Sequence, residues 1–109
     1  MNSASLRLAD LRNGRPRRIV VDGVAVAVVR VGDEVFAVDD ICTHAEVSLS
    51  EGEVSGCQIE CWLHGSRFDL RTGEPSGPPA FEPVKTYPVQ IDGQGDQAVV
   101  LVAVTEEAR

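Results

Sequence analysis

Two short segments, each holding one cysteine and one histidine, constrain this chain more than any other feature. Cys42 and His44 form a Cys-x-His pair, and Cys61 and His64 form a Cys-x₂-His pair later in the chain. The sequence contains only two histidines, and both belong to these pairs. Thiolate and imidazole groups in this arrangement indicate a metal centre that two loops hold from opposite sides.

The pairs suit a cluster of two irons and two sulfides with unlike ligands. Because the cysteine and histidine of each pair are separated by only one or two residues, a short loop can place its cysteine at one iron and its histidine at the other. The charges of two ferric ions, two sulfides and two thiolates cancel, so the oxidised cluster is neutral while both imidazoles are neutral. An electron is therefore added more easily than to an all-cysteine cluster, and the reduction potential is higher.

A structural zinc module is the alternative of a different class. Zinc also accepts cysteine and histidine, but zinc-binding sequences usually pair like residues, as C-x₂₋₄-C and H-x₃₋₅-H. The mixed pairs of this chain fit that spacing poorly. We therefore expect iron and sulfide at Cys42, His44, Cys61 and His64.

Length and charge narrow the classes of partner. The chain has 109 residues, enough for one domain, which we expect to span residues 1–109 as a monomer. Its net charge of −7 argues against nucleic-acid binding, which needs a basic face, and fits docking onto basic patches of other proteins. No stretch reaches the roughly 20 apolar residues of a membrane span, so we expect no membrane partner.

Cys57 is the third cysteine of the chain. With two cysteines as ligands only one is left over, so a disulfide framework is not expected. We interpret Cys57 as a partly buried free thiol, and we expect a reducing compartment, the cytoplasm.

Turn residues separate short apolar runs along the whole chain, and no segment has helical periodicity over ten residues. Asp22-Gly23 and Gly32-Asp33 divide residues 17–38 into a three-stranded meander, because these residues tolerate the positive φ of tight hairpins. Further strands are expected at residues 58–62, 66–70, 85–91 and 97–104, with the last two paired. The pattern predicts an all-β, antiparallel sandwich or partly open barrel.

The sequence resembles the Rieske-type ferredoxins, small electron carriers of bacterial aromatic-ring dioxygenase systems. The resemblance runs from about residue 6 to residue 104, and it is carried by Cys42-Thr43-His44, by residues 61–69, by Arg71-Thr72-Gly73 and by Gly77-Pro78-Pro79. It implies a Rieske-type antiparallel β-sandwich with a small cluster-binding subdomain. Two ligand loops and a proline loop, at about residues 40–80, would hold one Rieske [2Fe–2S] cluster through the four cysteine and histidine ligands.

Departures from the respiratory Rieske proteins place the chain in the ferredoxin branch. Those proteins carry two further cysteines that form a disulfide between the loops, and the matching positions here are Val47 and Leu63. They also direct a serine and a tyrosine hydroxyl toward the cluster. Ser66 matches the serine, whereas Phe68 replaces the tyrosine. The resemblance therefore implies cluster tuning by Ser66 and a potential below that of the respiratory proteins.

The resemblance also implies a carrier that is not itself an enzyme. Such a ferredoxin accepts an electron from a flavin-dependent ferredoxin reductase and passes it to a terminal non-haem iron oxygenase, with His44 and His64 at the docking edge. Trp62 lies between the ligands as part of this docking surface or as a packing shield. Similar proteins accompany iron–sulfur cluster assembly, and a small regulatory subunit of a larger reductase shares the fold, although such subunits often lack the ligands.

The purified protein is expected to be red-brown and to give an EPR signal after reduction, because a Rieske cluster absorbs visible light and is paramagnetic when reduced. Absorption and EPR spectra, together with iron and zinc analysis, check this. A colourless protein with stoichiometric zinc would support the structural zinc module instead.

Overall fold

The computed structural model describes residues 2–41, 47–63, 65–77 and 82–104. Within these ranges ten strands form three antiparallel sheets, and the helical content is limited to three short 3₁₀ turns. No helix among the described residues is long and apolar enough to cross a membrane. The predicted all-β, antiparallel class is confirmed.

Two of the three sheets combine strands that are far apart in the sequence. Sheet A has the spatial order β1 (Asn2–Arg7), β10 (Val99–Val104) and β9 (Val89–Asp92). Sheet B has the order β2 (Arg17–Val21), β3 (Val24–Val31), β4 (Glu34–Asp39) and β8 (Thr86–Tyr87). The small sheet consists of β5 (Val54–Ser55), β6 (Gln58–Glu60) and β7 (Arg67–Asp69). The 3₁₀ turns are η1 (Leu8–Asp10), η2 (Leu49–Glu51) and η3 (Gly95–Gln97).

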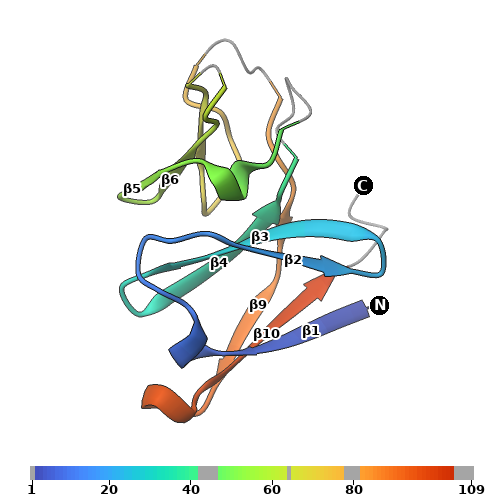
Figure 1. Cartoon of the computed structure of the whole chain (residues 1–109), viewed down its shortest axis with the longest axis vertical. Helices are drawn as coiled ribbons and strands as arrows, with labels where there is room; N and C mark the ends of the chain where they lie inside the picture. Colours follow the sequence, from blue (N-terminus) through green and yellow to red (C-terminus); the bar gives the residue numbers. More distant parts are fainter. Residues whose placement is uncertain (1, 42–46, 64, 78–81, 105–109) are drawn as a thin grey trace.

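Sheet B is the central layer, because its middle strand β3 is buried on both faces. Val26 and Val28 face a core shared with sheet A, whereas Ala27 and Val29 face a second core under the small sheet, and all four side chains are fully buried. Alternate residues of a strand point to opposite faces, so a strand with two buried faces reads as a continuous apolar run. Figure 1 shows sheet A in the lower half of the molecule and β5 and β6 in the upper half.

The predicted meander is confirmed as β2, β3 and β4, with Asp22 and Gly23 both at positive φ in the first turn. The strand expected at residues 85–91 is divided at Pro88: β8 pairs with β4 of sheet B, and β9 pairs with β10 of sheet A. Proline has no N–H to donate to a ladder, but its carbonyl accepts from the Ala103 N–H at 3.0 Å. The predicted pairing with residues 97–104 therefore holds for β9 alone.

Other expected elements differ at their ends. The strand expected at residues 58–62 stops at Glu60, because the next residue begins a hydrogen-bonded turn. The strand expected at residues 66–70 is β7, one residue shorter at each end. Strand β1 was not predicted: residues 3–7 do alternate, but Ala4 and Leu6 are the only apolar positions of Asn2–Arg7. Strand β5 has only two residues, too few for a pattern. The C-terminal tail, expected to fray, lies outside the described residues.

Replacing Gly73 by alanine is expected to destabilise the fold by about 2 kcal/mol or more. Gly73 has a φ of 80°, and an added Cβ would overlap the carbonyl oxygen of Val84. Val84 cannot easily move away, because its N–H donates to the Gly73 carbonyl at 2.9 Å. Thermal or denaturant unfolding measures the loss. Gly77→Ala is the matched control, because a Cβ there meets open space; equal stability of the two variants would contradict the prediction.

Candidate metal centre

The stem of the first ligand loop is the end of β4 and the start of η2. Ile41 forms an antiparallel bridge with Ser48, and the Leu49 N–H donates to the Asp40 carbonyl at 2.6 Å. The chain that leaves β4 therefore returns beside its own point of departure, as in a hairpin. Two predicted ligands, Cys42 and His44, belong to the segment between these ends and lie outside the described residues.

The second ligand loop begins at Cys61, directly after β6. The Cys61 N–H donates to the Ser66 carbonyl at 2.6 Å, and the Cys61 carbonyl accepts from the Gly65 N–H at 2.9 Å. Gly65 has a φ of 77°, which a side chain would disfavour. These bonds close a tight turn around the position of His64, which itself lies outside the described residues.

Cys61 and Ser66 are both buried at the base of this turn. The Cys61 side chain is fully buried in the second core, against residues such as Ile59 and Phe68, and it forms no disulfide. Ser66 is 1% exposed, and its Oγ has no hydrogen-bond partner among the described residues. An unsatisfied buried hydroxyl costs about 1–3 kcal/mol, so this turn presents a thiol and a donor that suit a cluster with sulfur acceptors.

The structure also describes the positions at which this chain departs from the respiratory Rieske proteins. Val47 packs against the second core, and Leu63 is 42% exposed. Neither residue is a cysteine, so these two positions cannot form a disulfide between the loops. Phe68 is fully buried in the same core and, unlike tyrosine, brings no hydroxyl. Cys57 is a free, partly buried thiol, as predicted.

A third stem follows β7. The chain after the Arg71-Thr72-Gly73 turn runs back along β7, with a Phe68–Pro75 bridge and a bond from the Ser76 N–H to the Arg67 carbonyl at 2.8 Å. It then reaches Gly77, the first residue of the expected proline loop. Pro78 and Pro79 lie outside the described residues. Three hydrogen-bonded stems thus lead to the three expected loops.

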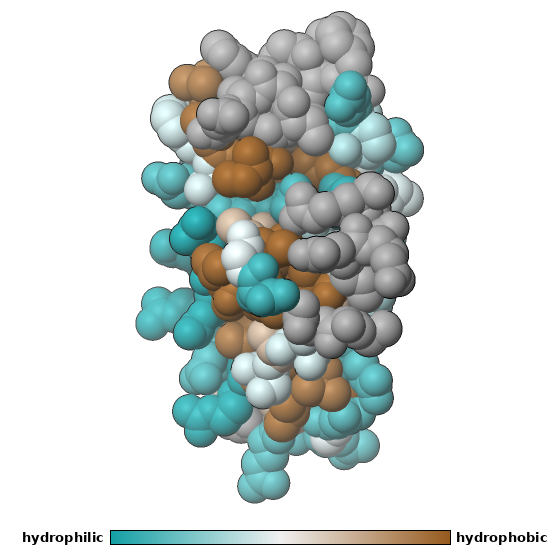
Figure 2. All heavy atoms as spheres, turned by 90° about the vertical axis from the view of Figure 1, so that its right-hand side faces the viewer, coloured by the Kyte–Doolittle hydropathy of each residue, from teal (hydrophilic) through white to brown (hydrophobic). Residues whose placement is uncertain are grey.

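Exposed apolar side chains flank the stems of the two ligand loops. Trp62 is 52% exposed, Leu63 is 42% exposed and Ile41 is 39% exposed. Figure 2 shows hydrophobic surface at this upper end of the molecule as well as lower on the same face. A side chain that shielded the site by packing would be largely buried, so the exposure of Trp62 favours its interpretation as part of a docking surface.

Asp40 is a buried carboxylate beside the predicted site, and the sequence analysis did not identify it. It is fully buried, two residues before Cys42, and its carboxylate accepts from the Arg18 Nε at 3.1 Å and the Ser50 N–H at 2.8 Å. The sequence offers one signal, an acidic Asp39-Asp40 pair beside a ligand pair. That signal does not distinguish the buried carboxylate from its half-buried neighbour.

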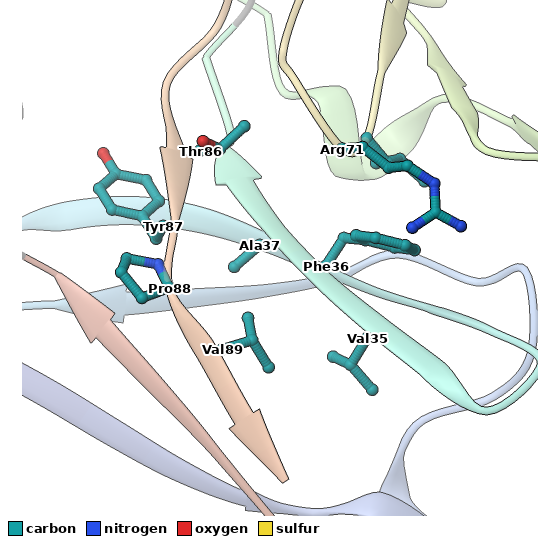
Figure 3. Close-up of a pocket in the computed structure, with 9 residues that line it drawn as sticks. Val35, Phe36, Ala37, Arg71, Thr86, Tyr87, Pro88 and Val89 are labelled. Atoms are coloured by element: carbon teal, nitrogen blue, oxygen red, sulfur yellow. The ribbon is translucent and has the colours of Figure 1, made fainter.

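A groove of about 330 Å³ lies away from the ligand stems, between β4 and the β8–β9 chain. In Figure 3, Phe36 and Arg71 lie on one side and Tyr87 and Pro88 on the other. The Arg71 guanidinium stacks 5.1 Å from the Phe36 ring centroid and donates to both oxygens of Glu34, at 2.9 and 2.7 Å. These hydrogen bonds hold the pKa of Glu34 below its usual value. Arg71, the one charged residue among the described residues that line the groove, is thus already paired.

A family model, a related sequence and two solved structures all indicate the same family for this chain. Residues 4–88 match the model of the Rieske [2Fe-2S] domain. The anthranilate 1,2-dioxygenase ferredoxin subunit of Burkholderia cepacia is 50% identical over 70 residues, which cover 63% of this chain and 65% of that relative. The chain therefore matches slightly less than two thirds of that protein's length.

Two solved structures are similar over nearly the whole chain. The ferredoxin of carbazole 1,9a-dioxygenase from Nocardioides aromaticivorans IC177 has a TM-score of 0.87 and 40% identity, covering 96% of this chain and 99% of that one. A second structure, a complex of reduced oxygenase and oxidised ferredoxin in carbazole 1,9a-dioxygenase, matches with a TM-score of 0.80 and 36% identity. This match covers 90% of the present chain and 99% of the matched chain.

Proposed function

This chain belongs to the Rieske [2Fe-2S] domain family, and on that premise we propose that Cys42, His44, Cys61 and His64 are the ligands of its cluster. The protein is a ferredoxin-type electron carrier with one Rieske [2Fe–2S] cluster. When bound, the cluster would supply one-electron chemistry: it accepts one electron from a donor protein and transfers it to an acceptor protein. The cysteines would bind one iron and the histidines the other.

The observation that carries the ligand assignment is the turn that joins Cys61 to Ser66. A buried thiol and a buried, unpartnered hydroxyl lie at the two ends of one hydrogen-bonded turn, with His64 between them in sequence. An apolar core residue at position 61 and a solvated serine at position 66 would be the ordinary outcome in a turn without a ligand. Burial of both groups supports a bound group that accepts a hydrogen bond and requires a thiolate.

The residues around this turn have separate tasks. Cys61 anchors the group to the second core, and the Ser66 hydroxyl donates toward it, which favours the more negative, reduced state. Leu63 and Trp62 leave an apolar surface at the docking end, where water must be removed before two redox centres approach closely. Phe68 fills the core without adding a second hydroxyl.

We assign the donor as a flavin-dependent ferredoxin reductase and the acceptor as a terminal non-haem iron oxygenase of the ring-hydroxylating class. The names of the relatives support the oxygenase as acceptor, as does the solved complex of a related ferredoxin with its oxygenase. The reductase as donor follows from the family resemblance. The net charge of −7 fits a basic docking site on the partners. None of the three proteins compared above is named for cluster assembly. The carrier would act as a monomeric single domain in the reducing cytoplasm.

Cys61→Ser is expected to reduce the iron content to background and to stop electron transfer from a flavin-dependent reductase to a ring-hydroxylating oxygenase. The substitution removes a thiolate from a fully buried position that no other described cysteine shares. Iron analysis and the rate of oxygenase reduction measure the effect. Cys57→Ser is the matched control and should retain both. A Cys61→Ser protein with full iron content would overturn the ligand assignment, and an intact carrier that reduces no oxygenase of this class would overturn the partner assignment.

Ser66→Ala is expected to lower the reduction potential while the cluster stays bound. A hydroxyl that donates to the cluster stabilises the added negative charge, and alanine removes that donor without adding volume. Redox titration of the holoprotein measures the shift, and Ser48→Ala serves as a control at the stem of the other loop. An unchanged potential in Ser66→Ala would remove Ser66 from the account.

A further inference from the structure

We propose that Asp40 is a positioning residue that, with Arg18, joins the two ends of the first ligand loop and sets part of the electrostatic environment of the cluster. This inference rests on the proposed role of Cys42 and His44 as ligands. It assigns a task to a buried carboxylate and an arginine that lie outside the four-ligand set.

Burial is the first argument. Asp40 and Ser66 are the two buried polar residues of the described chain, and the Asp40 side chain is fully inaccessible. Carboxylates are almost never fully buried unless they are paired, since an isolated charge loses its hydration. A solvent-exposed serine or asparagine would serve as well if residue 40 had only to end β4.

The contacts of Asp40 connect both ends of the loop. Its N–H donates to the Ala25 carbonyl of β3 at 3.0 Å, which fixes the end where the chain enters the loop. Its carbonyl accepts from the Leu49 N–H at 2.6 Å, and its Oδ1 accepts from the Ser50 N–H at 2.8 Å. The last two bonds hold the end where the chain returns. One residue therefore sets the span that the ligand segment must bridge.

Arg18 supplies the opposing charge from another strand. It lies on β2, opposite Ala27 of β3, and its Nε donates to the Asp40 Oδ2 at 3.1 Å. Its side chain is 51% exposed, so the guanidinium stays partly hydrated while the carboxylate does not. The ligand loop is thereby attached to sheet B through β2, β3 and β4 together.

The short chain between Asp40 and the proposed ligand Cys42 limits how far apart they can lie. Two residues of extended chain span at most about 7 Å, so Asp40 is within that distance of Cys42 along the backbone. A negative charge near the cluster opposes the added electron and lowers the potential, whereas a positive charge raises it. Removing the Asp40 charge should therefore raise the reduction potential, and removing the Arg18 charge should lower it. Both removals weaken the same stem.

The test compares Asp40→Asn and Arg18→Gln in the holoprotein. An amide has one acceptor oxygen and can keep only one of the two side-chain bonds, so loop anchoring weakens. Cluster release into an iron chelator is measured as the loss of visible absorbance. It should accelerate about tenfold in both variants, as expected for one lost bond to a charged group. Redox titration should show a raised potential in Asp40→Asn and a lowered potential in Arg18→Gln.

Matched controls separate this role from simple charge change. Asp33→Asn removes a carboxylate from the exposed hairpin at the far end of β4, and Arg17→Gln removes an exposed guanidinium next to Arg18. Release rates and potentials in Asp40→Asn and Arg18→Gln that match these controls would overturn the inference. So would potential shifts of the same sign, or a lowered thermal midpoint with unchanged release and potential, which marks a purely structural pair.

Cys42→Ser keeps this inference distinguishable from the ligand assignment. A Cys42→Ser protein with an intact cluster would mean that the ligand set is wrong. Loss of the cluster in Cys42→Ser, together with control-like behaviour of both pair variants, would refute only the role of Asp40. If Asp40→Asn does not fold, the release rate and potential of Arg18→Gln decide the outcome alone.

Discussion

Every layer of this molecule depends on the burial of β3 from both sides. Val26 and Val28 hold sheet A, and Ala27 and Val29 hold the small sheet that carries the second ligand loop. A strand in this position offers no polar face, so its side chains must match two cores at once. The redox site is consequently built on a central sheet that cannot shift toward one layer without opening the other.

The part of the site that the structure describes lies in the stems of the ligand loops. Each stem is closed by backbone hydrogen bonds, with Ile41 opposite Ser48 in the first loop and Cys61 bonded to Ser66 in the second. Such closure removes most of the chain entropy that ligation would otherwise have to overcome. The buried Ser66 hydroxyl leaves one donor unsatisfied in the described chain, which favours binding of an acceptor at that turn.

Sequence patterns predicted the local features of this fold well and its long-range features poorly. The meander follows from Asp22-Gly23 and Gly32-Asp33, whose preferred turns determine which strands pair. The transfer of the chain from sheet B to sheet A at Pro88 does not, because proline excludes a ladder bond without saying which sheet comes next. Cys61 was predicted from its motif, and Ser66 from the family resemblance. Asp40 was not, since burial of a carboxylate arises from packing between β2, β3 and η2, which no local spacing encodes.

The pairing of β1 with β10 has a consequence for how the protein forms. The register joins Asn2 to Val104, so the first and last described strands are neighbours in sheet A. Contacts of such large sequence separation are slow to form, because the entropy of closing a long loop must be lost before the strands can pair. During synthesis, the stems of the ligand loops leave the ribosome before β10 does. Both cysteine segments are therefore synthesised before sheet A can be completed by its central strand, β10.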